Sequence, residues 1–308
     1  MLEPGLILLR LAQEGTAMVL FGSSLFCVYA LPLDGPAAAA ALTWPKKLLI
    51  YSAAILVLAS LLGLIVQTAI MAGSITQGTK LQSLQAVLTA TNFAPASLVR
   101  AAAGAAALCV LILMAPQTGL WHATSLLGAI ACASLAWMGH GAATAGTPGR
   151  WHLAADVIHV MAAGMWVGAL TMFMGVLCWP DNVGNAVIHR ALKGFGALGS
   201  ALVAIVVATG LINSWFLIGL SHVADLWSSA YGRLLTFKLL LFASMLLLAA
   251  TNRFWLTPGL ERNLYRRLPR PGTSLTALRL CILLEASAAV LIIFLVAWLG
   301  TLPPPSAQ

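Results

Sequence analysis

Three ionisable side chains share one face of an otherwise apolar stretch, residues 151–166 (WHLAADVIHVMAAGMW). When the stretch is wound as a helix at about 100° per residue, His152, Asp156 and His159 fall within an arc of roughly 60°. A charged side chain near the middle of a membrane costs at least ~2.5 kcal/mol on insertion scales, so such residues are usually paired and functional. Imidazole is the commonest neutral metal ligand, and a carboxylate one turn away can orient the ring through its other nitrogen. The stretch therefore predicts a metal site inside a membrane helix.

Other apolar stretches carry ionisable side chains at a similar depth. They are His140 just before this stretch, Arg10 and Glu14 near the amino terminus, and Arg233 and Lys238 later in the chain. We expect these groups to converge in one layer of the bundle, with His140, His152, His159 and Asp156 as the candidate metal ligands. Charge pairing is the alternative, since Asp156 can simply neutralise Lys238 or Arg233.

Soft sulfur ligands are spread more widely. Met161 and Met165 lie on other faces of the same stretch, so one helix alone does not build a His/Met cage, and we keep them as possible path residues. Several sulfur side chains are expected in the other half of the membrane, where they would suit Cu(I), although Met and Cys also pack well in apolar helices. They are Cys27, Cys109, Met114, Met172, Met174, Cys178 and Cys281. Glu285 falls in the same half and can pair with a basic residue or serve a proton or ion path.

The composition requires a membrane protein. Of 308 residues, 61% are hydrophobic and 8% are charged, whereas soluble domains carry roughly 25% charged residues. The net charge is +8, but the basic residues sit mostly in short loops between apolar runs, which is typical of cytoplasmic loops rather than of nucleic-acid binding. Membrane lipid is therefore the expected partner, and no nucleic-acid partner is expected.

Eight apolar runs are long enough to span a membrane, for which about 20 residues are needed. They are residues 6–31, 48–71, 97–114, 120–140, 151–177, 196–217, 234–251 and 279–299. The sequence predicts an all-α integral membrane protein, a bundle of eight transmembrane helices that forms a single transmembrane domain over residues 1–308. Residues 77–91, between the second and third runs, are polar and amphipathic. They are expected to form an ordinary interfacial loop, with a segment lying on the membrane surface or a short re-entrant piece as the alternatives.

The loop between the last two spans sets the expected orientation. It holds Arg253, Arg262, Arg266, Arg267 and Arg270 against one acid, Glu261. An excess of Lys and Arg marks cytoplasmic loops. Both termini are then expected on the periplasmic side, and Asp156 and His159 in the outer third of their span.

Short motifs along the chain resemble those of the copper resistance protein D family (CopD/PcoD). They are V-L-T-x-T at residues 87–91, Gly139-His140, the D-x-x-H of Asp156 and His159, W-x-G-x-L at 166–170, Y-G-R-L-L-x-x-K at 231–238, N-R at 252–253, L-R-x(5)-E at 278–285 and L-G-T-L-P-P at 299–304. Each motif is short, but their order and spacing cover the chain from before its third span to its end.

The resemblance implies a multi-pass protein of the bacterial inner membrane that moves copper from periplasm to cytoplasm, with a periplasmic copper-binding partner of the copper resistance protein C type. It points to His140, Asp156 and His159 for metal capture, while His152 lies outside the motif. Under this interpretation Glu14, Arg233, Lys238 and Glu285 are path or pairing residues.

The leading hypothesis is therefore a copper transporter contributing to copper homeostasis and resistance, and not an enzyme, with Cu(I) or Cu(II) as cargo. No phosphate-binding GxxxxGK[ST] motif is present, so transport would be downhill or coupled to protons or membrane potential. Low pH should weaken capture, because a protonated imidazole cannot bind metal. The main alternative is a b-type cytochrome that holds haem between histidines of facing helices. A copper sensor or scaffold that does not transport, and an ion-coupled transporter of another solute, are further alternatives.

Overall fold

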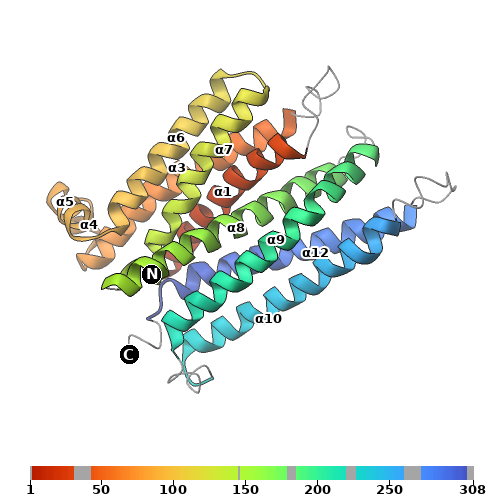
Figure 1. Cartoon of the computed structure of the whole chain (residues 1–308). Helices are drawn as coiled ribbons and strands as arrows, with labels where there is room; N and C mark the ends of the chain where they lie inside the picture. The colour runs from red at the N-terminus through yellow and green to blue at the C-terminus, as the bar shows by residue number, and fades with distance from the viewer. Residues whose placement is uncertain are drawn as a thin grey trace.

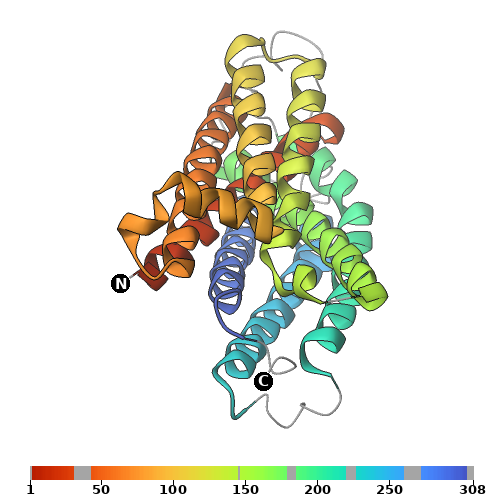
Figure 2. The same ribbon diagram turned by 90° about the vertical axis from the view of Figure 1, so that its left-hand side faces the viewer.

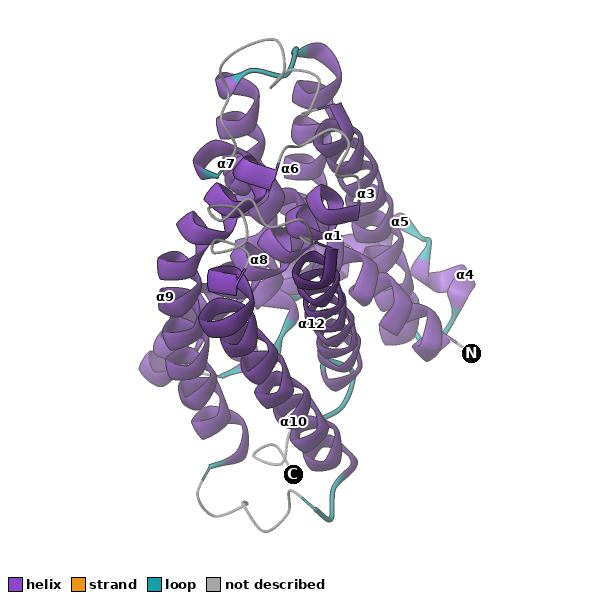
Figure 3. Cartoon of the chain, turned by 90° about the vertical axis from the view of Figure 1, so that its right-hand side faces the viewer, coloured by secondary structure: helices purple, strands orange, loops and turns teal. Residues whose placement is uncertain are grey.

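The computed structural model of this chain describes residues 2–30, 43–144, 146–178, 185–219, 227–259 and 272–303, and contains no strand among them. Eight of its helical segments are long and apolar enough to cross a membrane. They are built on α1 (Leu2–Tyr29), α3 (Thr43–Met71), α6 (Phe93–Leu113), α7 (Thr118–Ala133), α8 (Gly146–Cys178), α9 (Asn185–Ile218), α10 (Ala230–Thr251) and α12 (Gly272–Leu299). The predicted all-α fold with eight spans is confirmed, and Figure 3 shows the helices in purple.

Most helices begin a few residues before the predicted apolar run, because their first turns are polar or contain proline and glycine. The largest difference is in α9, which starts at Asn185 rather than at residue 196. The fourth span differs in kind. Its α-helix ends at Ala133, and the chain continues as a 3₁₀-helix, η1 (Ser134–Met138), before Gly139 and a second short 3₁₀-helix, η2 (His140–Ala143).

The helices form two groups, which Figure 1 shows side by side. In the first group α1, α3, α6 and α7 pack around one another, whereas in the second α9 packs on α8 and α10 packs on α12. The groups meet through α1, which contacts both α8 and α12. The start of α1 and the end of α12 lie at one end of the bundle, which we call the terminal end. Two short helices, α4 (Ile75–Gly78) and α5 (Leu81–Ala90), lie at this end and cover α3 and α6 (Figure 2).

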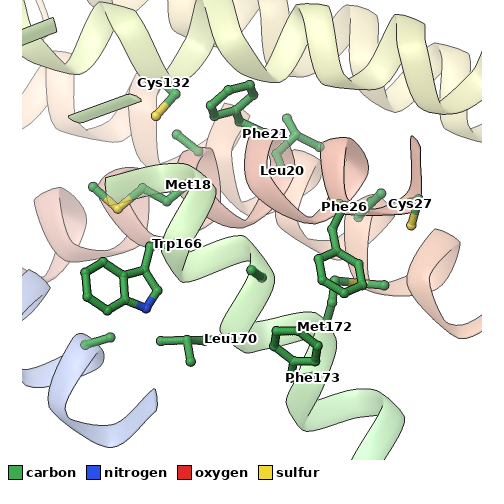
Figure 4. Packing of buried hydrophobic residues seen from close by; sticks show 14 of the residues in the cluster. Met18, Leu20, Phe21, Phe26, Cys27, Cys132, Trp166, Leu170, Met172 and Phe173 are labelled. Carbon is green, nitrogen blue, oxygen red and sulfur yellow. The ribbon is translucent and has the colours of Figure 1, made fainter. Parts of the chain in front are cut away.

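Glycines allow α1 and α8 to approach closely. A Cβ atom on Gly22 would lie 2.1 Å from the Gly164 carbonyl oxygen, and one on Gly168 would lie 2.2 Å from the Gly22 backbone. Small residues four apart are the usual means by which membrane helices bring their backbones together. On either side of this crossing, Phe21, Phe26 and Phe173 fill the core between the two helices (Figure 4). The crossing fixes the position of the polar face of α8 relative to α1.

Candidate functional site

A cavity of about 520 Å³ lies between α1, α8, α9, α10 and α12. It exists because α9 and α10 pack on different neighbours, α8 and α12, and leave space between them. One face of α8 lines the cavity with His152, Asp156, His159 and Trp166, the same side chains that the helical periodicity places on one stripe. Opposite this stripe α1 contributes Arg10 and Glu14, and α10 contributes Lys238.

Asp156 is held by α9 and by the loop that follows η1. The Asn213 side-chain amide donates a hydrogen bond of 3.1 Å to Asp156 Oδ1. The other oxygen, Oδ2, lies against the loop, since a Cβ atom added to Gly139 or Gly141 would stand 3.3 Å or 3.0 Å from it. The backbone on both sides of His140 therefore passes directly beside this carboxylate. The side chain of His140 itself lies outside the described residues.

The hydrogen bonds of His159 determine which of its nitrogens can bind a ligand. Its Nδ1 lies 2.9 Å from the Thr209 hydroxyl on α9. That hydroxyl also lies 2.6 Å from the Ile205 carbonyl oxygen, so it can donate to this carbonyl when it accepts a hydrogen bond from Nδ1–H of the ring. The neutral ring then carries its lone pair on Nε2. Because His159 lines the cavity, this arrangement presents the nitrogen in the form that a metal ion requires.

His152 lies nearer the terminal end and is more enclosed. Its Nδ1 lies 2.8 Å from the Thr144 hydroxyl, and its ring stacks on Phe216 of α9 with centroids 4.6 Å apart and an interplanar angle of 12°. Only 1% of its surface is exposed. These contacts fix the ring between α9 and the loop before α8, one helical turn closer to the terminal end than Asp156.

Charges of both signs face one another across the cavity. Lys238 lies close enough to attract both Asp156 and Glu14, and Arg10 attracts Glu14 as well. Arg10 also donates a hydrogen bond of 3.1 Å to the Met138 carbonyl oxygen at the end of η1. Two buried oxygens of cavity-lining side chains, Glu14 Oε2 and Asn213 Oδ1, have no hydrogen-bond partner among the described residues. Unsatisfied buried oxygens are costly in a membrane interior and would be satisfied by a bound cation or by water.

The predicted ligands that the structure describes thus line one cavity, but they are not close enough together to bind one metal ion. Among the described side chains, no group of three or more His, Cys, Asp or Glu residues is close enough to hold a metal ion. His152, Asp156 and His159 each hydrogen bond to a different neighbour. A complete site on this face would need His140 or a side chain from another wall of the cavity.

The remaining predicted path or pairing residues lie elsewhere. Arg233 is exposed at the start of α10 and donates to the Ser228 carbonyl oxygen at 3.1 Å. Met161 and Met165 pack against the apolar core of the bundle. Glu285 is buried on α12, where the Cys281 thiol lies 3.6 Å from its carboxylate and the Asn252 side chain also bonds to it. Asn252 begins a π-helix, η5 (Asn252–Leu256), that continues α10.

Of the sulfur side chains predicted for the half of the membrane away from the terminal end, Cys27, Met172, Met114 and Met174 pack in or against the main apolar core, and the cysteines are dispersed. Cys27 is fully buried in the core and Cys109 is exposed on α6. The Cys281 thiol donates to the Leu248 carbonyl oxygen at 3.4 Å. The side chain of Cys178 lies outside the described residues.

A second polar cluster lies beside the cavity, in the first helix group. The Arg100 side chain of α6 is fully buried and donates to the Ser134 hydroxyl and carbonyl oxygens, both at 3.0 Å, and to Gln13 of α1. Gln13 in turn donates to the Ala59 carbonyl oxygen of α3 at 3.1 Å. Ser134 is the first residue of η1, so Arg100 binds the segment where the fourth span changes from α-helix to 3₁₀-helix. The Arg100 cluster, Arg100 with Gln13 and Ser134, therefore positions the loop that carries His140.

Sequence reasoning missed several residues that line or support the cavity. Asn213 and Thr209 are the partners of Asp156 and His159, and Met18 and Met245 are sulfur side chains that line the cavity. An asparagine inside an apolar span is a signal in itself, because intramembrane polar groups need partners. Met18 follows Glu14 by one helical turn and could have been placed on its face. Nothing in the sequence distinguishes Met245 from the other methionines.

Comparisons with known proteins agree with the family resemblance of the sequence motifs. The family model described as "Copper resistance protein D-like, N-terminal domain" matches residues 1–151, and that described as "Copper resistance protein D" matches residues 189–299. The chain is 36% identical over 308 residues to copper resistance protein D of Pseudomonas syringae pv. tomato, covering 98% of this chain and 97% of that protein. It is 27% identical over 138 residues to the inner membrane protein YebZ of Escherichia coli K12, covering 44% and 46% of the two chains. No solved structure matches.

Proposed function

Because this chain belongs to the copper resistance protein D family and is a multi-pass inner-membrane protein, we propose that it carries copper ions from the periplasm to the cytoplasm. The observation that carries the proposal is the cavity within the span region, lined by Asp156 and His159. Such a cavity offers a cation polar and charged side chains inside the membrane, which the surrounding lipid does not.

Capture is assigned to His140, Asp156 and His159, with His152 as a supporting ligand. Asp156 lies against the glycines on both sides of His140, so its carboxylate lies next to the backbone of His140. The two oxygens without partners, Glu14 Oε2 and Asn213 Oδ1, offer further ligands on the neighbouring walls. Imidazole nitrogen suits copper, whereas carboxylate oxygen is a harder ligand that does not select Cu(I).

The basic side chains of the cavity explain how a bound ion could leave. Lys238 and Arg10 lie near Asp156 and Glu14, so the two carboxylates are compensated when no ion is present. An uncompensated pair of carboxylates would hold a cation too tightly, whereas compensated ones return to a low-energy state after release. Lys238 and Glu14 are therefore proposed as path residues, with membrane potential or protons as the driving force.

The basic loop between α10 and α12 supports an orientation in which the terminal end of the bundle faces the periplasm. The charged end of the cavity is then nearer the periplasm, where a copper-binding protein of the copper resistance protein C type would deliver the ion.

Copper uptake into proteoliposomes tests the function, with His159→Ala compared against His122→Ala. Both variants lose one imidazole, but His122 is exposed and bonds to the Thr118 carbonyl oxygen away from the cavity. We expect uptake to fall by about tenfold or more in His159→Ala only, because even outer partners of metal ligands are worth roughly 10- to 100-fold in affinity. Unchanged uptake and binding in His159→Ala would remove the site. A Soret absorption band in stoichiometric amount in the purified protein would instead favour the cytochrome alternative.

A further inference from the structure

The cavity changes chemical character along its length. Near the terminal end it is lined by carboxylates, imidazoles and amino groups, whereas α1 and α10 each contribute a methionine, Met18 and Met245, farther along. Met18 follows Glu14 by four residues and Met245 follows Lys238 by seven. At 1.5 Å per residue the two residues lie about 6 Å and about 10 Å farther along their helices than these charged residues. They are the deepest cavity-lining residues of their helices, and we call this end the floor.

The floor is enclosed, with exposed fractions of 7% for Met18 and 4% for Met245. Trp166 of α8 and Ala289 of α12 complete it, and all four belong to one contiguous cluster of buried side chains. Figure 4 shows the Met18 side chain extending from α1 next to the Trp166 indole. Both methionines therefore belong to the apolar core and also line the cavity.

We infer that Met18 and Met245 form a thioether site for Cu(I) at the floor of the cavity, so that the ion passes from oxygen and nitrogen ligands to sulfur ligands as it moves inward. The inference rests on the proposed copper transport and specifies the oxidation state of the cargo at this point. Soft thioether sulfur selects Cu(I), while carboxylate and carboxamide oxygens do not. An adjacent indole also attracts a cation through its ring.

The same geometry distinguishes these methionines from those on α8. Met161 and Met165 belong to the partly buried side chains packed against the core, and neither lines the cavity. A Met→Leu exchange keeps volume and apolar character, and cores tolerate such volume-conserving exchanges best. Met165→Leu is therefore a matched control for loss of one thioether without loss of a cavity ligand.

X-ray absorption of the purified full-length protein loaded with Cu(I) under a reductant tests the site directly. We expect sulfur neighbours around copper in the wild type and in Met165→Leu, and their loss in Met18→Leu/Met245→Leu. The Cu(I) affinity of the double variant, measured by competition with a chromogenic chelator, should fall by more than about tenfold. Absence of bound Cu(I), absence of sulfur neighbours in the wild type, or wild-type behaviour of the double variant would each overturn the inference.

The two proposals fail separately. Normal Cu(I) coordination in Met18→Leu/Met245→Leu together with lost uptake in His159→Ala would reject the thioether site and leave the transport proposal standing. Wild-type vesicles that take up no copper would reject transport, whereas sulfur coordination that disappears only in the double variant would still support the site.

Discussion

The Arg100 cluster and the cavity are two groups of buried polar side chains in neighbouring parts of the bundle, and they use their polar atoms differently. Arg100 donates to four groups on two other segments, and its partner Gln13 is bonded to a third segment. In the cavity, by contrast, Glu14 Oε2 and Asn213 Oδ1 have no partner among the described residues.

Packing explains the difference. In the first group of helices α1, α3, α6 and α7 enclose their interior, so every polar atom there must be satisfied by the protein. In the second group α9 and α10 do not pack on each other to a comparable extent, and far less of their surface is buried than in the other spans. A polar group that is satisfied internally supports the fold, whereas one facing a cavity remains available to a cargo.

The largest effect on stability is expected from Arg100→Leu. The substitution leaves Gln13 and the Ser134 carbonyl without their donor inside the closed group, and removing one partner from a buried charged network costs roughly 3–5 kcal/mol. Thermal unfolding in detergent should show a clearly lower midpoint. Arg233→Leu is the control, because Arg233 is exposed and, within the part of the chain that the structure describes, bonds to the loop carbonyls of Trp227 and Ser228. Equal midpoints for the two variants would contradict a structural role for the Arg100 cluster.

Asp156→Asn should show the opposite pattern, with a large effect on copper and a small one on stability. An amide is less costly to bury than an ionised carboxylate, and Glu14 still attracts Lys238 after the exchange, so we expect the free energy of unfolding to fall by less than in Arg100→Leu. Copper affinity should fall by roughly 10- to 100-fold, at least as much as for the loss of an outer partner. Chelator competition measures the affinity and thermal unfolding the stability. A destabilised protein with normal copper affinity would place Asp156 with the structural cluster instead.

Thr209→Val is expected to have the smallest of these effects. The valine cannot accept a hydrogen bond from Nδ1–H, so His159 loses the contact that favours the tautomer with a free Nε2. Copper affinity should fall by about tenfold, at the lower end of the range for outer partners. Thr171→Val is the control, since its hydroxyl bonds only to the Val167 carbonyl oxygen of its own helix, at 2.8 Å. Identical affinities in the two variants would show that Thr209 does not orient the ring.

Several features of the cavity could be predicted from particular residues. The spacing of His152, Asp156, His159 and Trp166 places them on one helical stripe, and all four line the cavity. Glu14 and Lys238 could be assigned to the same layer, because the predicted directions of their spans place both residues at a similar depth in the membrane. Arg233 could not be separated from Lys238 in this way, although it lies on the protein surface.

Partners contributed by distant helices were not predictable. Asn213 and Thr209 come from α9, and their pairing with Asp156 and His159 depends on how α9 lies across α8. The choice of Met18 and Met245 over Met161 and Met165 likewise depends on which helices leave space between them. Periodicity gives the face of a helix but not the neighbour that this face meets.

The sequence by itself determined that this protein is a membrane bundle of eight helices of the copper resistance protein D family, because apolar length and short motifs are local properties of the chain. Tertiary structure alone decided that α9 and α10 stand apart, that a cavity opens between them, and which polar atoms remain unsatisfied within it. The physical reason is that a cavity is the absence of a contact, and contacts between distant helices are set by the packing of all of them together.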